Sequence, residues 1–119
     1  MKMRIYTHLQ KFTTGDATQE DWEALLFRIK IGIGLGKNFE ETTVISTEMA
    51  IGLDILGKCH EHFVRENSWF LEPEEIDSIR QCLNIVDDLQ DKTTRKEQLP
   101  VFIAAKHDVD NMVIYENRT

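Results

Sequence analysis

The chain has 119 residues, a length at the mode of domain sizes, so one domain is expected and two are not. Hydrophobic residues make up 41% and charged residues 29%, which excludes a disordered chain and favours a folded domain with an apolar core. The 21 acidic and 14 basic side chains leave a formal net charge of −7, which disfavours direct binding to nucleic acid or to an anionic membrane.

No stretch approaches the roughly 18 consecutive apolar residues of a transmembrane helix, and the N-terminal residues lack the apolar run of a signal peptide. The two cysteines are too few for the disulfide framework of a small secreted protein. Both lie in apolar stretches, where buried free thiols are typical. We therefore expect a cytoplasmic protein that makes no contact with a membrane.

The N-terminal residues 1–15 are expected to form a short strand or an extended arm, because apolar and polar residues alternate weakly over positions 3–9. A helix is predicted over 18–33. It begins where Thr18 precedes the carboxylate of Asp21 by three residues, the pattern of a capping box, and apolar residues follow at helical spacing.

Three glycines, Gly32, Gly34 and Gly36, fall at the end of this predicted helix. Each interior glycine costs a helix about 1 kcal/mol relative to alanine, so we expect the helix to end inside the run. Glycines also occur where two backbones come close. The run lacks the spacing of a phosphate-binding or dinucleotide-binding loop, so it predicts no nucleotide cofactor.

The longest apolar pattern predicts a helix over 40–66. Its apolar residues are spaced 4, 3, 4, 3 and 4, as the a and d positions of a heptad repeat are: Ile45, Met49, Gly52, Leu56, Cys59 and Phe63. Val44, Ile51 and Ile55 broaden this seam. We expect this helix to be central and to present apolar residues on two sides.

A third helix is predicted over 73–92. Pro73 suits the first helical position, and Glu74 and Glu75 suit the positive end of the helix dipole. The connection to the preceding helix is short, so the two helices should form an antiparallel hairpin.

The last helix is predicted over 100–115. Thr94 and Glu97 form a second capping-box pattern, but a helix that started there would contain Pro100 at a cost of about 3 kcal/mol. We therefore expect a turn of helix or a break before Pro100, with Pro100 near the start of the last helix. The fold class is all-α: a small antiparallel bundle of about four helices in a single domain, 1–119, with a short N-terminal strand or extended arm.

The acidic residues are concentrated, because positions 72–91 hold seven carboxylates and one arginine and so carry −6 of the net −7. Such a segment is either a solvated helix face or a docking surface for a basic partner. The connector before it, residues 67–71, contains two aromatic residues that suit an apolar anchor. The predicted partner-binding residues are Trp69, Phe70, Glu74, Asp77, Asp88 and Asp91.

Cys59, His62 and Cys82 form the densest set of potential metal ligands. Cys59 and His62 share a helix face, and with Cys82 they would give three ligands of a tetrahedral zinc site. The chain lacks a CxxC pair and an HExxH motif, and both cysteines lie on apolar seams. We expect structural thiols and no metal or other cofactor.

The sequence favours a non-enzymatic interaction protein, a small acidic regulator or inhibitor that occupies a surface of another protein. We expect a homodimer with Ile51 and Ile55 in its interface, because the helix over 40–66 has more apolar surface than the few other helices would cover. One alternative is an acidic mimic of nucleic acid that blocks a basic groove. A second is a metal- or thiol-dependent protein that uses Cys59, His62 and Cys82.

Overall fold

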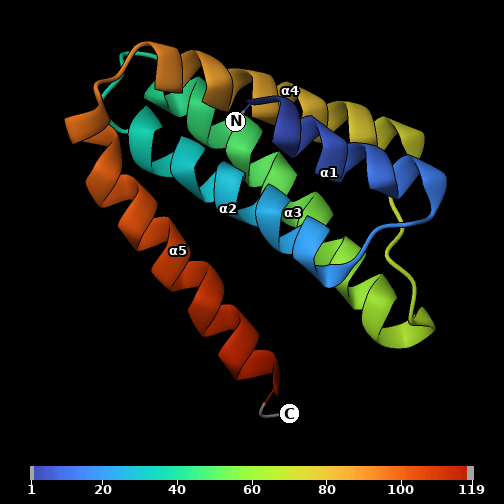
Figure 1. The fold of residues 1–119 in the computed structure, drawn as a ribbon. Helices are drawn as coiled ribbons and strands as arrows, with labels where there is room; N and C mark the ends of the chain where they lie inside the picture. The colour runs from blue at the N-terminus through green and yellow to red at the C-terminus, as the bar shows by residue number, and fades with distance from the viewer. Residues whose placement is uncertain (1, 118–119) are drawn as a thin grey trace.

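The computed structural model describes residues 2–117 of the chain and the side chains of residues 4–111. This part of the chain forms five helices and no strand, so the predicted all-α class is confirmed (Figure 1). None of the helices within these residues has both the length and the apolar character that crossing a membrane requires. The helices are α1 (Lys2–Thr14), α2 (Gln19–Gly36), α3 (Thr42–Glu66), α4 (Pro73–Asp91) and α5 (Arg95–Asn117).

Helix α1 stands in place of the strand or extended arm predicted for residues 1–15. Ile5, Leu9 and Phe12 lie at i, i+4 and i+7, and all three are buried, so they form the apolar stripe of a helix. This stripe packs on α2 and α4, and Figure 1 shows α1 running alongside α4. The prediction was wrong because the weak alternation covered few residues, whereas burial of a stripe with a period of three to four residues selects a helix.

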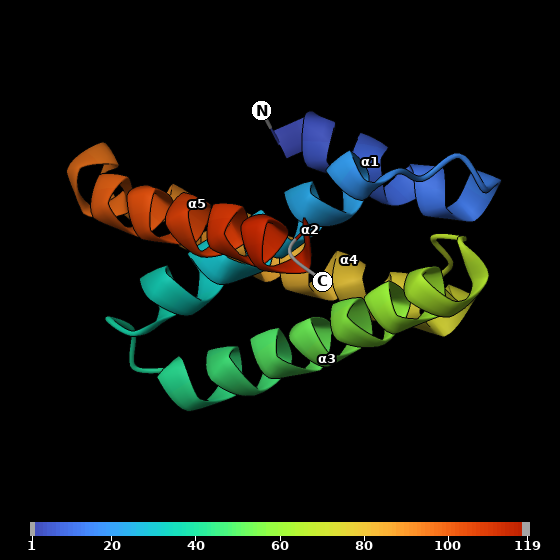
Figure 2. The same cartoon turned by 90° about the horizontal axis from the view of Figure 1, so that it is seen from below.

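Helix α2 is the central helix, because it packs against each of the other four (Figure 2). A helix that is apolar around most of its circumference is buried on most of its sides. The prediction that the helix over 40–66 is central was therefore wrong: α3 packs on α2 and α4 from one side of the bundle. The large buried side chains of α2 are Trp22, Leu25, Leu26, Ile29, Ile31 and Leu35.

The glycine run does not end α2, which continues through all three glycines. A Cβ atom at Gly32 would lie 2.6 Å from Val86 of α4 and 2.7 Å from Met49 of α3. A Cβ atom at Gly34 would lie 2.6 Å from Val101 of α5. The glycines therefore allow three neighbouring helices to approach α2 closely, and this packing offsets the helical cost that suggested an earlier end.

Stacked aromatic rings hold the turn between α3 and α4. Asn67 ends α3 in the left-handed conformation, with φ at 55°, which asparagine tolerates better than most residues. The ring of Trp69 stacks on Phe63 with centroids 4.1 Å apart and on Trp22 at 5.7 Å. The Nε1–H of Trp22 donates a hydrogen bond of 2.9 Å to the carbonyl of Leu56. The result is the antiparallel α3–α4 hairpin visible in Figure 1.

Helix α5 begins at Arg95, so a turn of helix precedes Pro100, which was one of the two predicted alternatives, and the predicted start of the last helix at residue 100 was wrong. The capping box is formed: Thr94 N donates to Glu97 Oε1 at 2.9 Å, and Glu97 N donates to Thr94 Oγ1 at 3.1 Å. Pro100 lies inside the helix and lacks one backbone donor. The capping box and the packing of the following residues on α2 keep the segment helical despite this loss.

Candidate functional site

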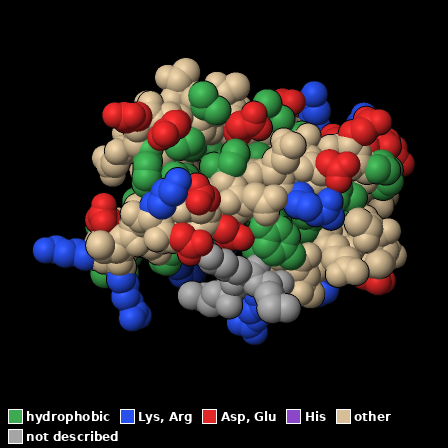
Figure 3. Space-filling model, turned by 90° about the horizontal axis from the view of Figure 1, so that it is seen from above, with side chains coloured by type: hydrophobic (Ala, Val, Ile, Leu, Met, Phe, Trp, Pro, Cys, Tyr) green, Lys and Arg blue, Asp and Glu red, His purple; other side chains and the backbone are tan. Residues whose placement is uncertain are grey.

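The four predicted carboxylates of α4 lie on its solvent-facing side. We define the outer stripe of α4 as Glu74, Asp77, Gln81, Asn84, Asp88 and Asp91, which are spaced 3, 4, 3, 4 and 3 and are all exposed. The opposite side of the helix is buried in the core. Figure 3 shows the molecule from the α4 side, with acidic side chains standing among hydrophobic ones.

Two carboxylates of the outer stripe pair with a cation three or four residues further along the chain. Asp77 pairs with Arg80 at 2.9 Å, and Asp88 pairs with Lys92 at 2.9 Å. The hydrogen bond and the charge of Asp88 raise the pKa of Lys92. These exposed i,i+3 and i,i+4 pairs are weak, so both carboxylates remain available to a stronger basic partner.

Tyr6 of α1 borders the outer stripe, a neighbour that the sequence did not predict. Its hydroxyl lies 2.5 Å from Asn84 Oδ1 and 3.0 Å from Asp87 Oδ2, both of which are acceptors. Burial, with the hydrogen bond to Asp87, raises the pKa of Tyr6 to about 12. The contact ties α1 to α4 and fixes one edge of the stripe.

Of the two predicted aromatic anchors, Phe70 is accessible and Trp69 is not. Trp69 is 9% exposed because it is part of the aromatic stack, whereas Phe70 is 45% exposed. Phe70 and Asp77 line the same hollow of about 370 Å³, between the end of α1 and the start of α4. The structure therefore brings Phe70 together with Asp77 of the outer stripe.

The predicted dimer residues Ile51 and Ile55 differ in their surroundings. Ile55 is 8% exposed and belongs to the core of its own chain, while Ile51 is 44% exposed. The heptad seam of α3 is covered by α2 and α4, and its residues from Ile45 to Cys59 are buried. The seam therefore needs no second copy to cover it.

The three candidate ligands do not form one site. Cys59 and His62 line a common hollow of about 310 Å³, but Cys82 lies further along the α3–α4 contact, where its thiol donates to the carbonyl of Glu48 at 3.2 Å. Burial raises the pKa of Cys59 to about 12 and that of Cys82 to about 11. Burial therefore favours the protonated thiols at neutral pH, whereas the nucleophilic form of cysteine is the thiolate.

A buried carboxylate that the sequence suggested merely as a helix cap anchors α1 to α2. Asp21 is 1% exposed and accepts hydrogen bonds from the backbone and hydroxyl of Thr18, at 2.8 and 3.0 Å, and from His8 of α1. Lys11 lies 3.5 Å away. Burial alone would raise the pKa of Asp21, but the hydrogen bonds of His8 and Thr18 and the charge of Lys11 outweigh it and lower the pKa.

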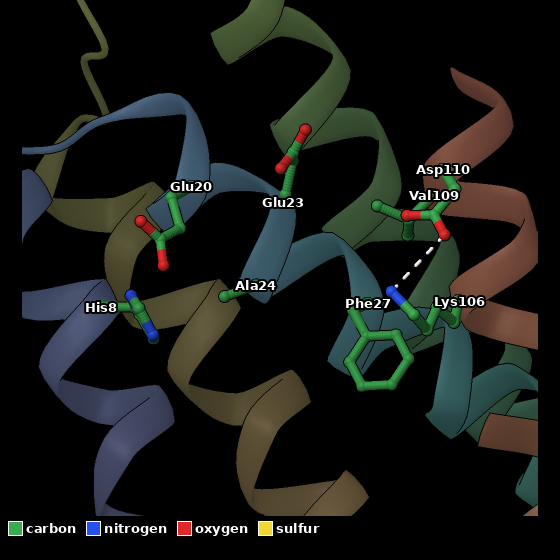
Figure 4. Close-up of a pocket in the computed structure, with 8 residues that line it drawn as sticks. All are labelled: His8, Glu20, Glu23, Ala24, Phe27, Lys106, Val109 and Asp110. Atoms are coloured by element: carbon green, nitrogen blue, oxygen red, sulfur yellow. Dashed lines mark ion pairs between the residues drawn. The ribbon is translucent and has the colours of Figure 1, made fainter. Parts of the chain in front are cut away.

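His8 also faces a hollow of about 270 Å³ between α1, α2 and α5 (Figure 4). Glu20 points toward His8, and Glu23 points away from it. On the far side, Lys106 and Asp110 of α5 form an ion pair of 3.4 Å. Within the described side chains, no group of three or more histidine, cysteine or acidic residues is arranged to hold a metal ion.

Comparison with models of protein families, with curated proteins and with solved structures finds no match to this chain.

Proposed function

We propose that this protein is a non-enzymatic interaction module, a small acidic regulator or inhibitor that occupies a basic surface of another protein. The binding surface is the outer stripe of α4 together with Phe70. The observation that carries this proposal is the placement of a half-exposed aromatic ring beside the acidic stripe, since Phe70 and Asp77 line one hollow. Aromatic anchors dominate the energy of protein interfaces, and charges around them select the partner.

The partner's chemistry follows from this arrangement. The ring of Phe70 requires an apolar pocket, and the carboxylates of α4 require lysine or arginine side chains around that pocket. Steering by opposite charges raises the association rate and makes it depend on salt. We place this activity in the cytoplasm, because Cys59 and Cys82 are free thiols.

The spacing of the carboxylates supports binding to a basic surface around an apolar pocket over mimicry of nucleic acid in a basic groove. The four carboxylates of the outer stripe span about 25 Å of helix, whereas duplex DNA carries about one charge per 1.7 Å of its axis. Asp77 and Asp88 are also paired with nearby cations of their own chain. Discrete charged contacts beside one apolar anchor suit a basic surface around an apolar pocket. They do not reproduce the continuous row of charges that a phosphate backbone presents to a basic groove.

The test is a capture experiment with matched variants of the tagged protein. Wild-type protein should retain one partner that is lost from Phe70→Ala and from a variant in which the four carboxylates of the stripe become amides. The control is Val64→Ala, because Val64 is 69% exposed on α3, a helix that contributes no residue to the stripe. Capture of the same proteins by all the variants would overturn the proposal, provided that circular dichroism shows each variant folded.

A further inference from the structure

The outer face of α5 has exposed apolar residues that no other part of the described structure covers. Leu99 is 57% exposed and Ile103 is 64% exposed, while Ala105 and Val109 on the other side of the helix are buried. The packing of α5 is mainly on α2, and Figure 1 shows it lying along one edge of the bundle. Two large aliphatic side chains one turn apart therefore form an apolar patch on this face.

The residues around this patch are arranged symmetrically about Ile103. Lys96, Leu99, Ile103, His107 and Asp110 are spaced 3, 4, 4 and 3, so they share one helical stripe and all are exposed. Lys96 and Asp110 stand seven residues on either side of Ile103 and carry opposite charges. A stripe with this symmetry matches an inverted copy of itself, which is the requirement for a twofold interface.

We propose that this face binds a second copy of the chain, through antiparallel pairing of two α5 helices across a twofold axis at Ile103. Ile103 then contacts Ile103 of the second copy, and each Leu99 packs beside His107 of the other chain. Each Lys96 faces Asp110 of the other chain, so two opposite-charge pairs close the ends of the patch. Within its own chain Asp110 is paired at 3.4 Å with the exposed Lys106, a weak contact that does not prevent this pairing.

This inference rests on the homodimer expected from the sequence, but it moves the interface from Ile51 and Ile55 of α3 to α5. The α3 seam is covered within the chain, whereas none of the side chains described for residues 4–111 covers the outer face of α5. The interface is short, so self-association is expected in the micromolar range. The α4 binding surface lies on a different helix, and failure of either proposal leaves the other standing.

Disulfide trapping tests the twofold axis directly. Two residues at the centre of an antiparallel helix pair approach closely enough for a disulfide, so Ile103→Cys should give a covalent dimer under mild oxidation. The native cysteines do not interfere, because Cys59 is 3% exposed and Cys82 is 0% exposed. Val64→Cys is the matched control: its site is 69% exposed on α3, and it should form far less dimer.

Charge exchange tests the register, with the mass measured by analytical ultracentrifugation from low to high micromolar concentration. Lys96→Glu and Asp110→Lys should each weaken the dimer severalfold, because each places like charges opposite one another. The double variant should restore the wild-type dimer, because it exchanges the two partners. Ile103→Asp should give a folded monomer, as judged by circular dichroism.

Three results would overturn the proposal. The first is a wild-type mass that stays at 13.9 kDa at every concentration. The second is a dimer that Ile103→Asp leaves intact. The third is a charge-exchanged double variant that associates no better than the single variants, which would exclude the antiparallel register.

Discussion

His8 Nδ1 of α1 lies 2.5 Å from Oδ1 of Asp21, a carboxylate at the start of α2 that is 1% exposed. The same carboxylate closes the capping box with Thr18. One side chain therefore fixes both the first turn of α2 and the position of α1, which the sequence did not predict to be a helix.

Replacing Asp21 with asparagine should destabilise the fold by about 3 kcal/mol, because it removes one partner of a buried charged network. His8→Ala should cost less, since Thr18 and Lys11 still contact the carboxylate. Urea denaturation of both single variants and the double variant measures the coupling. Strictly additive losses would contradict a direct His8–Asp21 interaction.

Asp21 should also make stability depend on pH. Its pKa in the folded protein is lowered, so its contribution is fully present above its ordinary value of 3.8 and is lost as the pH falls further. The wild-type free energy of unfolding should therefore decrease below that pH more steeply than that of Asp21→Asn. Parallel acid profiles for the two proteins would show that Asp21 titrates normally in the folded state.

Alanine at two glycines should change stability in opposite directions. Gly32→Ala should destabilise by about 1–3 kcal/mol, because the new methyl group would meet Val86 and Met49 at 2.6 and 2.7 Å. Gly57→Ala in α3 has nothing within 4 Å of its Cβ and should stabilise by about 0.5–1 kcal/mol through helix propensity. Thermal denaturation of the two variants checks the signs, and stabilisation by Gly32→Ala would contradict the close packing on α2.

The two neighbouring aromatic residues should separate stability from binding. Trp69→Ala should cost about 3–5 kcal/mol, since it empties the stack with Phe63 and Trp22. Phe70→Ala should cost about 1 kcal/mol or less, because the ring is 45% exposed. Chemical denaturation gives both values, and equal losses would mean that Phe70 is a core residue and not a contact for a partner.

The parts of the fold that followed from sequence are those with strong local signals. Helix α4 lies close to the predicted 73–92, because Pro73 and the acidic first turn specify its start and a regular apolar stripe specifies its length. The alternation in α1 was too short to distinguish a strand from a helix. The residue at which α2 ends could not be predicted, because the helix continues through its glycines where other helices pack closely on it. The packing of Val86 and Met49 around Gly32 is an example, and no local pattern in the sequence shows it.

The candidate site, too, could be predicted from the sequence only in part. Exposure of Glu74, Asp77, Asp88 and Asp91 followed from their spacing on one helix. Which of Trp69 and Phe70 is buried did not follow, because the answer depends on rings contributed by α2 and α3.

The central claim is that Phe70 and the outer stripe of α4 bind a basic protein surface, and calorimetric titration of the captured partner tests it most directly. Phe70→Ala should weaken the affinity by at least about 30-fold, the effect of removing an interface anchor, and rising salt should weaken the remaining binding. Val64→Ala should bind like the wild-type protein. Equal affinities of the wild-type protein and Phe70→Ala, independent of salt, would contradict the claim.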